Sequence, residues 1–180
     1  MKRRSVMTRR RFMTAVGASS AATVFWRASS GLLATASQGA KRGPIFEVTK
    51  TESEWRSLLT PQQFKILRQA DTEAPNSSPL NKEHRPGTFS CAGCALPLFT
   101  SDTKFESGTG WPSFYAPMDN AVRTADDRSL GMDRTEVLCR RCGGHLGHVF
   151  DDGPRPTGKR YCMNGAAMTF RARAAKDDQP

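Results

Sequence analysis

The five cysteines of this chain fall into two close pairs and one single residue. The sequence CAGC spans Cys91 to Cys94, and the sequence CRRC spans Cys139 to Cys142. Cys162 stands alone in the sequence RYCMN. Thiolates can bind a metal, form disulfides or act as nucleophiles. The spacing therefore predicts that the paired cysteines and the single cysteine perform different tasks.

The two pairs together match the ligand set of a structural zinc ion. Each pair supplies two thiolates from one tight turn, and four sulfur ligands complete a tetrahedral site. We therefore expect zinc to be bound by Cys91, Cys94, Cys139 and Cys142. Disulfide bonds are the alternative if the protein works in an oxidising compartment. A site closed by four sulfurs leaves no position for a substrate, so a catalytic zinc is not expected.

Cys162 has polar neighbours that suit an acid–base reaction. Arg160 and Asn164 are each two residues away and would share its face in a β-strand. A cation near a thiol favours the reactive thiolate. His145 and His148, in the sequence HLGHVF, add side chains that titrate near neutral pH. The alternatives are a buried structural cysteine and a cysteine–histidine dyad that acts on acyl substrates.

An aromatic residue occupies a loop flanked by glycines. Trp111 lies in the sequence GTGWPSF, which covers residues 108–114. Tryptophan is largely buried in most proteins, so packing in the core is one interpretation. An exposed indole on such a loop would instead provide a flat apolar wall for a small substrate group.

The order of helix and strand signals predicts a mainly β domain that begins with two short helices. Capping residues at Thr51 and Thr60 mark the two helix starts. From about residue 89, short apolar runs alternate with Gly, Pro, Asn and Asp, which favours short antiparallel strands. The segment 151–160 is rich in turn residues. We therefore expect HLGHVF and RYCMN to pair as neighbouring strands.

Most of the net charge of +10 lies at the N-terminus, where residues 1–36 hold seven basic side chains and no acidic one. An apolar run and a small-residue end with the sequence ATA follow in the order of an export signal. TRRRFM resembles a twin-arginine motif. We therefore expect a twin-arginine-type signal segment at 1–36 and an exported, periplasmic or other extracytoplasmic protein. A basic amphipathic tail is the alternative.

The charge outside the first 36 residues is close to balanced, with 20 basic and 17 acidic side chains. This gives little support to nucleic-acid binding. The apolar run is too short and too polar for a stable membrane span. We expect a linker at 37–45, one domain at 46–174 and a disordered tail at 175–180.

Several motifs together resemble type B methionine sulfoxide reductases, from about residue 46 to residue 173. These are CAGC, SGTGWPSFYAP and the long run GMDRTEVLCRRCGGHLGHVFDDGPRPTGKRYCMN. The resemblance implies two small antiparallel sheets in a β-tent-like arrangement, with short N-terminal helices and a pair of structural zinc knuckles. It also implies a monomer that uses a thiol reductant to convert methionine R-sulfoxide, in oxidised proteins and in free form, to methionine.

The resemblance also assigns roles to individual residues. Cys162 would attack the sulfoxide sulfur and become a sulfenic acid, and Arg160 would favour its thiolate. Protons and water around the sulfoxide oxygen would be organised by His145, His148 and Asn164. Substrate would be bound by Trp111, at its methyl group, and by Phe114.

Two positions depart from the family pattern. Thr109 occupies the place where many members have a resolving cysteine, so an external reductant is required. A thioredoxin-like protein, a glutaredoxin with a small thiol, or a membrane-linked thiol carrier would serve. Gly165 stands where serine is usual, and the missing hydroxyl would cost ~1 kcal/mol if it formed a hydrogen bond. A zinc-bound interaction module without chemistry is the alternative function.

Overall fold

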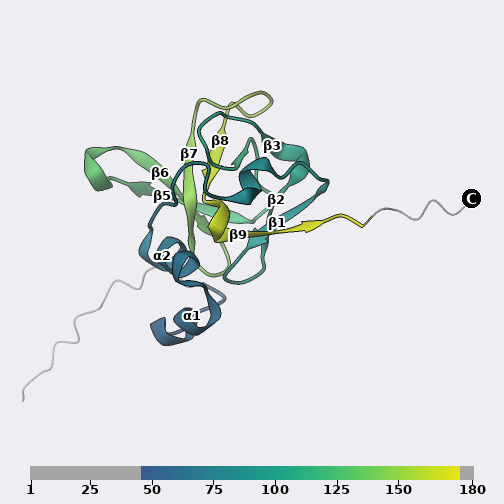
Figure 1. Ribbon diagram of the computed structural model, residues 1–180. Coiled ribbons are helices and arrows are strands. Elements are labelled where there is room, and N and C mark those ends of the chain that lie inside the picture. The colour runs from purple at the N-terminus through teal and green to yellow at the C-terminus, as the bar shows by residue number, and fades with distance from the viewer. Residues whose placement is uncertain (1–45, 175–180) are drawn as a thin grey trace, which may run out of the picture. The chain divides into compact units, whose positions relative to one another are not determined.

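The computed structural model describes residues 46–174, which form a mainly β domain with two antiparallel sheets (Figure 1). The smaller sheet has the strand order β2–β1–β9, with β1 at Gly87–Cys91, β2 at Pro97–Thr100 and β9 at Met168–Ala172. The fold class predicted from the sequence is confirmed for these residues. The predicted signal segment, linker and tail, at 1–36, 37–45 and 175–180, lie outside the described residues.

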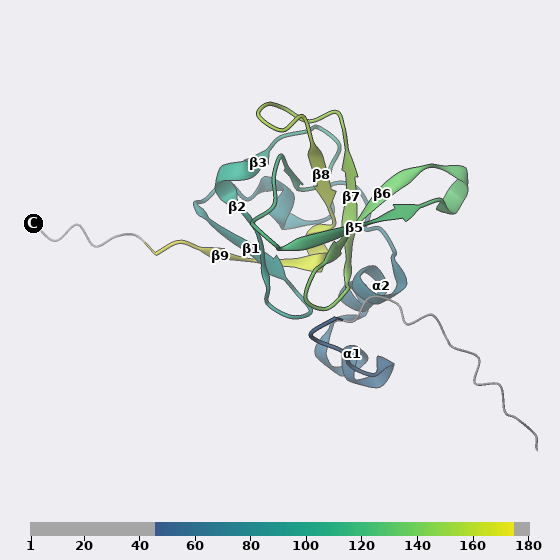
Figure 2. The ribbon, with the colours of Figure 1, turned by 180° about the vertical axis from the view of Figure 1, so that it is seen from behind.

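The larger sheet has six strands in the order β3–β4–β8–β7–β6–β5. Their bounds are β3 Lys104–Phe105, β4 Ser113–Phe114, β5 Val122–Asp127, β6 Arg134–Cys139, β7 His145–Phe150 and β8 Arg160–Met163. The hairpin of β5 and β6 projects from the body of the domain, as the two opposite views show (Figures 1 and 2). It ends in a short 3₁₀ turn at Ser129–Gly131.

Two helices precede the strands, α1 at Glu52–Leu58 and α2 at Pro61–Gln69. Each begins with a complete capping box, on Thr51 and on Thr60, as predicted. Both contribute apolar side chains to the hydrophobic core. None of the described helices is long and apolar enough to cross a membrane.

The core contains a cluster of aromatic rings contributed by strands of both sheets. Phe99 stacks on Phe114 with ring centroids 4.3 Å apart, and Phe89 meets Phe114 edge-on at 5.0 Å. Phe114 is 0% exposed. The prediction that Phe114 binds substrate is therefore wrong: its ring is held among other aromatic rings and is not available to a ligand.

The predicted pairing of HLGHVF with RYCMN is confirmed, because β7 and β8 are antiparallel neighbours. His148 lies directly opposite Cys162 in this pair, and Gly147 lies opposite Met163. Residues directly opposite in antiparallel strands have side chains on the same face. A Cβ on Gly147 would lie 2.2 Å from the carbonyl oxygen of Cys162. The absence of a side chain at this position thus permits the close approach of the two strands.

We expect Gly147→Ala to lower the free energy of unfolding by about 1–3 kcal/mol, because the added methyl group collides with the backbone of β8. Urea denaturation would measure the change. Gly158→Ala is the control, since a Cβ there would meet no atom within 4 Å and only its left-handed backbone, at φ +70°, is strained. Equal stability of the Gly147→Ala variant and the wild-type protein would contradict the close approach.

Candidate active site

Cys162 lies on an inner strand of the larger sheet and lines a small cavity. Its strand β8 runs between β4 and β7, and the residues opposite it are Ser113 and His148. The cavity has a volume of about 150 Å³. Four of the residues predicted from the sequence line it: Cys162, His148, Asn164 and Trp111. Thr72, Arg134, Gly147 and Phe150 complete the lining.

The imidazole of His148 is held by the β5–β6 hairpin. Its Nε2 lies 2.8 Å from Oδ2 of Asp127, and Arg134 donates to the same oxygen at 2.7 Å. Hydrogen bonds from Ser129, with a further contribution from His148, hold the pKa of Asp127 well below its usual range. An ionised carboxylate therefore fixes the orientation of the histidine that faces Cys162.

His145 lies beside His148 but does not line the cavity of Cys162. The two rings are 5.4 Å apart, and His145 borders an adjoining cavity of about 480 Å³. Its Nδ1 lies 2.6 Å from Oε1 of Glu136, and its Nε2 has no partner among the described residues. Burial lowers the pKa of His145, although the Glu136 carboxylate opposes this effect. The neutral imidazole then donates its Nδ1–H to Glu136.

The thiol of Cys162 is half-buried and ends a short chain of hydroxyl groups. Its Sγ lies 3.8 Å from Oγ1 of Thr109, which is 2.8 Å from Oγ of Ser107. Burial raises the pKa of the Cys162 thiol, while the Thr109 hydroxyl and the charge of Arg160 lower it by a smaller amount. The charge of Arg160 thus favours the thiolate, but burial has the larger effect.

Two contacts, with Asp152 and with Phe150, hold the guanidinium of Arg160 in place. Its Nε and Nη2 each donate to the Asp152 carboxylate at 2.8 Å. The guanidinium also lies over the ring of Phe150, 4.4 Å from the centroid. Arg160 does not line the cavity of Cys162, and its charge is one of the influences that lower the pKa of the thiol.

Asn164 and Trp111 are fixed by hydrogen bonds to backbone groups. Asn164 accepts from the backbone N–H of Glu73 at 3.0 Å and donates to the carbonyl of Leu146 at 3.2 Å. The indole N–H of Trp111 donates to the carbonyl of Glu73 at 3.1 Å. Trp111 is thus a partly exposed wall of the cavity, and Asn164 also anchors the cavity to the segment before η1 (Pro79–Lys82).

The departure at Gly165 has a steric explanation. A Cβ at this position would lie 2.1 Å from Oγ and 2.5 Å from Cβ of Ser78. Ser78 cannot simply rotate away without loss, because its hydroxyl caps the backbone N–H of Leu80. The glycine therefore suits the close approach of these two segments in this chain.

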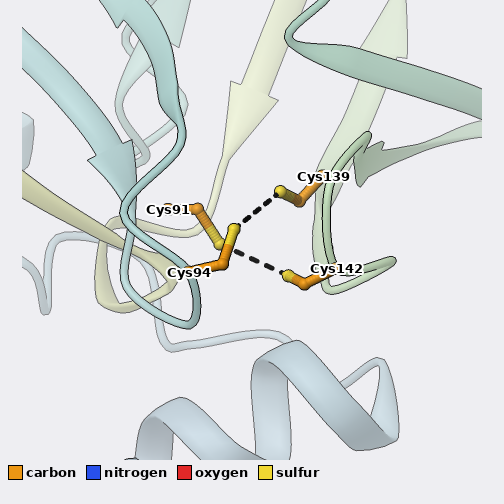
Figure 3. Close-up of side chains that lie close together, drawn as sticks. All are labelled: Cys91, Cys94, Cys139 and Cys142. Atoms are coloured by element: carbon orange, nitrogen blue, oxygen red, sulfur yellow. Dashed lines mark hydrogen bonds between the residues drawn. The ribbon is translucent and has the colours of Figure 1, made fainter. Parts of the chain in front are cut away.

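The four paired cysteines meet in one cluster, which joins the turn after β1 to the turn after β6 (Figure 3). Their sulfur atoms all lie within 4.8 Å of one another. The distance is 3.7 Å from Cys91 to Cys142 and 3.5 Å from Cys94 to Cys139. Four sulfurs ~2.3 Å from a tetrahedral zinc would be about 3.8 Å apart. The cluster therefore fits a structural zinc ion.

The two cysteine turns have the same backbone pattern. The N–H of Ala95 donates to the carbonyl of Cys91 at 2.8 Å, and the N–H of Gly143 donates to the carbonyl of Cys139 at 2.9 Å. The side chain of Arg68 on α2 donates to the carbonyl of Cys142 at 3.0 Å. The two backbone bonds fix the turns that carry the thiols, and the bond from Arg68 connects α2 to the second turn.

Comparison with known proteins agrees with this geometry. The family model of the SelR domain matches residues 59–172. The peptide methionine sulfoxide reductase MsrB of Leptospira interrogans is 55% identical over 127 residues, which cover 70% of this chain and 97% of that protein. The proteins of the same name from Methanosarcina barkeri and Pseudomonas putida are 54% and 52% identical, covering 69% and 71% of this chain and 88% and 96% of theirs. The chain belongs to the MsrB family of peptide methionine sulfoxide reductases.

Several residues of the site were not predicted from the sequence. Glu136 could have been found, because a tight turn between RTEVLC and HLGHVF pairs the two strands and sets Glu136 opposite His148. The positions of Asp127 and Arg134 could not be predicted, because they depend on the length and bend of the β5–β6 hairpin. Glu73 is 91 residues from Asn164 in the chain, and no local pattern indicates their contact.

We expect the rate of alkylation of Cys162 by iodoacetamide to increase with pH beyond the ordinary titration range of a cysteine. The raised pKa leaves the group protonated at neutral pH, and the thiolate forms only as pH rises. Arg160→Gln should move the profile to higher pH by about one unit, since a stabilising charge is lost. Mass spectrometry of the peptide that contains Cys162 would measure both profiles.

Arg155→Gln is the matched control for this experiment, because Arg155 is exposed on the loop between β7 and β8. It should leave the alkylation profile unchanged. A profile that moves to lower pH in the Arg160→Gln variant would contradict the assigned effect of the guanidinium.

Proposed function

We propose that this enzyme reduces the R-sulfoxide of methionine, with Cys162 as the nucleophile. The observation that carries the proposal is the position of Cys162 opposite His148, in a cavity walled by Trp111. The volume of about 150 Å³ suits a side chain the size of methionine sulfoxide. Family membership favours this reaction over a cysteine hydrolase and over an interaction module without chemistry.

The reaction transfers the sulfoxide oxygen to the enzyme. The Cys162 thiol gives up its proton, attacks the substrate sulfur and forms an S–S bond, while a proton held near His148 reaches the sulfoxide oxygen. The protonated oxygen then moves to the cysteine sulfur as the S–S bond breaks, so methionine is released and Cys162 becomes a sulfenic acid. The thiol supplies two electrons, so the sulfoxide is reduced as the cysteine is oxidised. Asp127 and Arg134 keep the imidazole in place during the transfer.

An external thiol completes the cycle. It condenses with the sulfenic acid to form a mixed disulfide and water, and a second thiol then restores Cys162. The hydroxyl of Thr109 lies 3.8 Å from Cys162 Sγ and cannot act as a resolving residue. The other four cysteines of the chain all lie in the metal-binding cluster. The proposed reductant is a thioredoxin-like protein, a glutaredoxin with a small thiol, or a membrane-linked thiol carrier.

We further propose a structural zinc ion, a monomeric state and an export route. Zinc is bound by the four clustered cysteines and has a structural task, because sulfur would fill every ligand position. The protein acts as a monomer on oxidised proteins. The N-terminal sequence with TRRRFM directs export by the twin-arginine route, which would let the domain fold and bind zinc in the reducing cytoplasm.

We expect the wild-type protein, supplied with dithiothreitol, to reduce the R-sulfoxide of a blocked methionine and not the S-sulfoxide. Cys162→Ser should lower turnover by roughly 10³-fold or more, since serine is a far weaker nucleophile towards sulfur. Chromatography of the methionine product would measure both. Hydrolysis of activated esters without consumption of dithiothreitol would instead indicate the hydrolase.

We expect Cys139→Ser to release zinc and to destabilise the domain by more than about 4 kcal/mol, because metal binding contributes directly to folding. Zinc content by atomic absorption and thermal denaturation would measure the effects. Cys162→Ser is the control and should retain both zinc and stability. Equal loss of zinc in the two variants would mean that the cysteines have been assigned to the wrong tasks.

A further inference from the structure

Glu73 is a buried acidic residue whose backbone contacts two walls of the cavity of Cys162. It is 5% exposed and lies in the segment between α2 and η1. Among the described residues, no Lys, Arg or His nitrogen lies within 4.0 Å of its carboxylate. An acidic group so placed is costly unless hydrogen bonds stabilise it. Its hydrogen bonds therefore indicate what it does.

The carboxylate of Glu73 binds the first turn after β8. It accepts from the backbone N–H of Gly165 at 2.6 Å and from that of Ala166 at 2.9 Å. These residues begin η4 (Gly165–Ala167), directly after Asn164. Hydrogen bonds to an ionised acceptor are short and strong. They fix Glu73 relative to the strand that carries Cys162.

The backbone of Glu73 binds two walls of the cavity at once. Its N–H donates to the amide oxygen of Asn164, and its carbonyl accepts from the indole of Trp111. A second bond, from the N–H of Asn76 to the carbonyl of Gly110 at 2.7 Å, supports the loop of Trp111. In this loop, Gly108 and Gly110 have left-handed φ angles of +74° and +95°. Glycines impose little rigidity, so the position of Trp111 depends on contacts from outside the loop.

We propose that Glu73 is a positioning residue that holds Trp111 and Asn164 at a fixed separation around Cys162. The carboxylate anchors the segment to η4, and the two backbone bonds then set the places of the indole and the amide. Glu73 does not line the cavity of Cys162. Its effect on catalysis rests on the proposed sulfoxide reductase function, because Trp111 is the wall for the substrate methyl group.

The test compares Glu73→Gln with the wild-type protein. The amide keeps the size of the side chain but sets an NH₂ group against one of the two backbone N–H donors. We expect KM for the R-sulfoxide to increase about tenfold, as the loss of one strong hydrogen bond allows Trp111 to move. The alkylation rate of Cys162 should change less than about twofold, since no contact of the thiol is altered.

A spectroscopic measurement reports on the indole without any need for activity. In the full-length wild-type protein, the indole N–H signal of Trp111 should exchange slowly with deuterium, because it is bonded to Glu73. Trp111→Phe identifies the signal by its loss. Glu73→Gln should speed the exchange at least about fivefold. Glu52→Gln, on the exposed face of α1, is the matched control and should change neither KM nor exchange.

The outcomes separate the two proposals. Unchanged KM and unchanged indole exchange in Glu73→Gln would overturn the role of Glu73. If Glu73→Gln does not fold, Glu73→Asp is the second variant, because it keeps the charge and shortens the side chain. Fast indole exchange in the wild-type protein would by itself be sufficient to reject the contact between Trp111 and Glu73. A wild-type protein with slow indole exchange and no sulfoxide reduction would refute the proposed function and leave the positioning role standing.

Discussion

The antiparallel pairing of β7 with β8 is the interaction on which the site depends. It sets His148 directly opposite Cys162, so a group that can hold a proton and a thiol face the same cavity. The two strands lie close together because Gly147 has no side chain. At one end of the pair, the N–H of Asn164 donates to the carbonyl of Leu146 at 2.8 Å. A slip of one residue in this register would turn Cys162 to the other face.

The remaining parts of the domain keep this pair of strands in place. The cluster of four cysteines joins the turn after β1 to the turn before β7, and so connects the two sheets. The β5–β6 hairpin carries the Asp127 carboxylate that orients His148. Glu73 connects the loop of Trp111 to the end of β8. Each of these contacts joins residues far apart in the sequence, so the cavity forms only when the whole domain has folded.

Local sequence patterns predicted the mainly β fold, both helix starts, the pairing of β7 with β8, and the separation of four clustered cysteines from Cys162. These features follow from capping, alternation and spacing. The roles of Glu73 and Asp127 could not be predicted, because they depend on contacts between distant segments. Phe114 was misplaced because a family motif does not state which of its aromatic residues is buried. His145 lies beside His148 because the register of β6 and β7 shifts between Val137 and Leu138, which leaves Leu146 as an extra residue in β7.

The central claim is that the sulfoxide oxygen passes to only one of the five cysteine sulfurs, that of Cys162. Its most direct test is a single turnover without reductant, with the purified full-length protein and a stoichiometric amount of methionine R-sulfoxide, followed by trapping with a reagent selective for sulfenic acids. Mass spectrometry of the peptides would locate the adduct. The account predicts one methionine released per protein and an adduct on Cys162 alone. An adduct on any cysteine of the metal-binding cluster, or release of methionine with Cys162 unmodified, would contradict it.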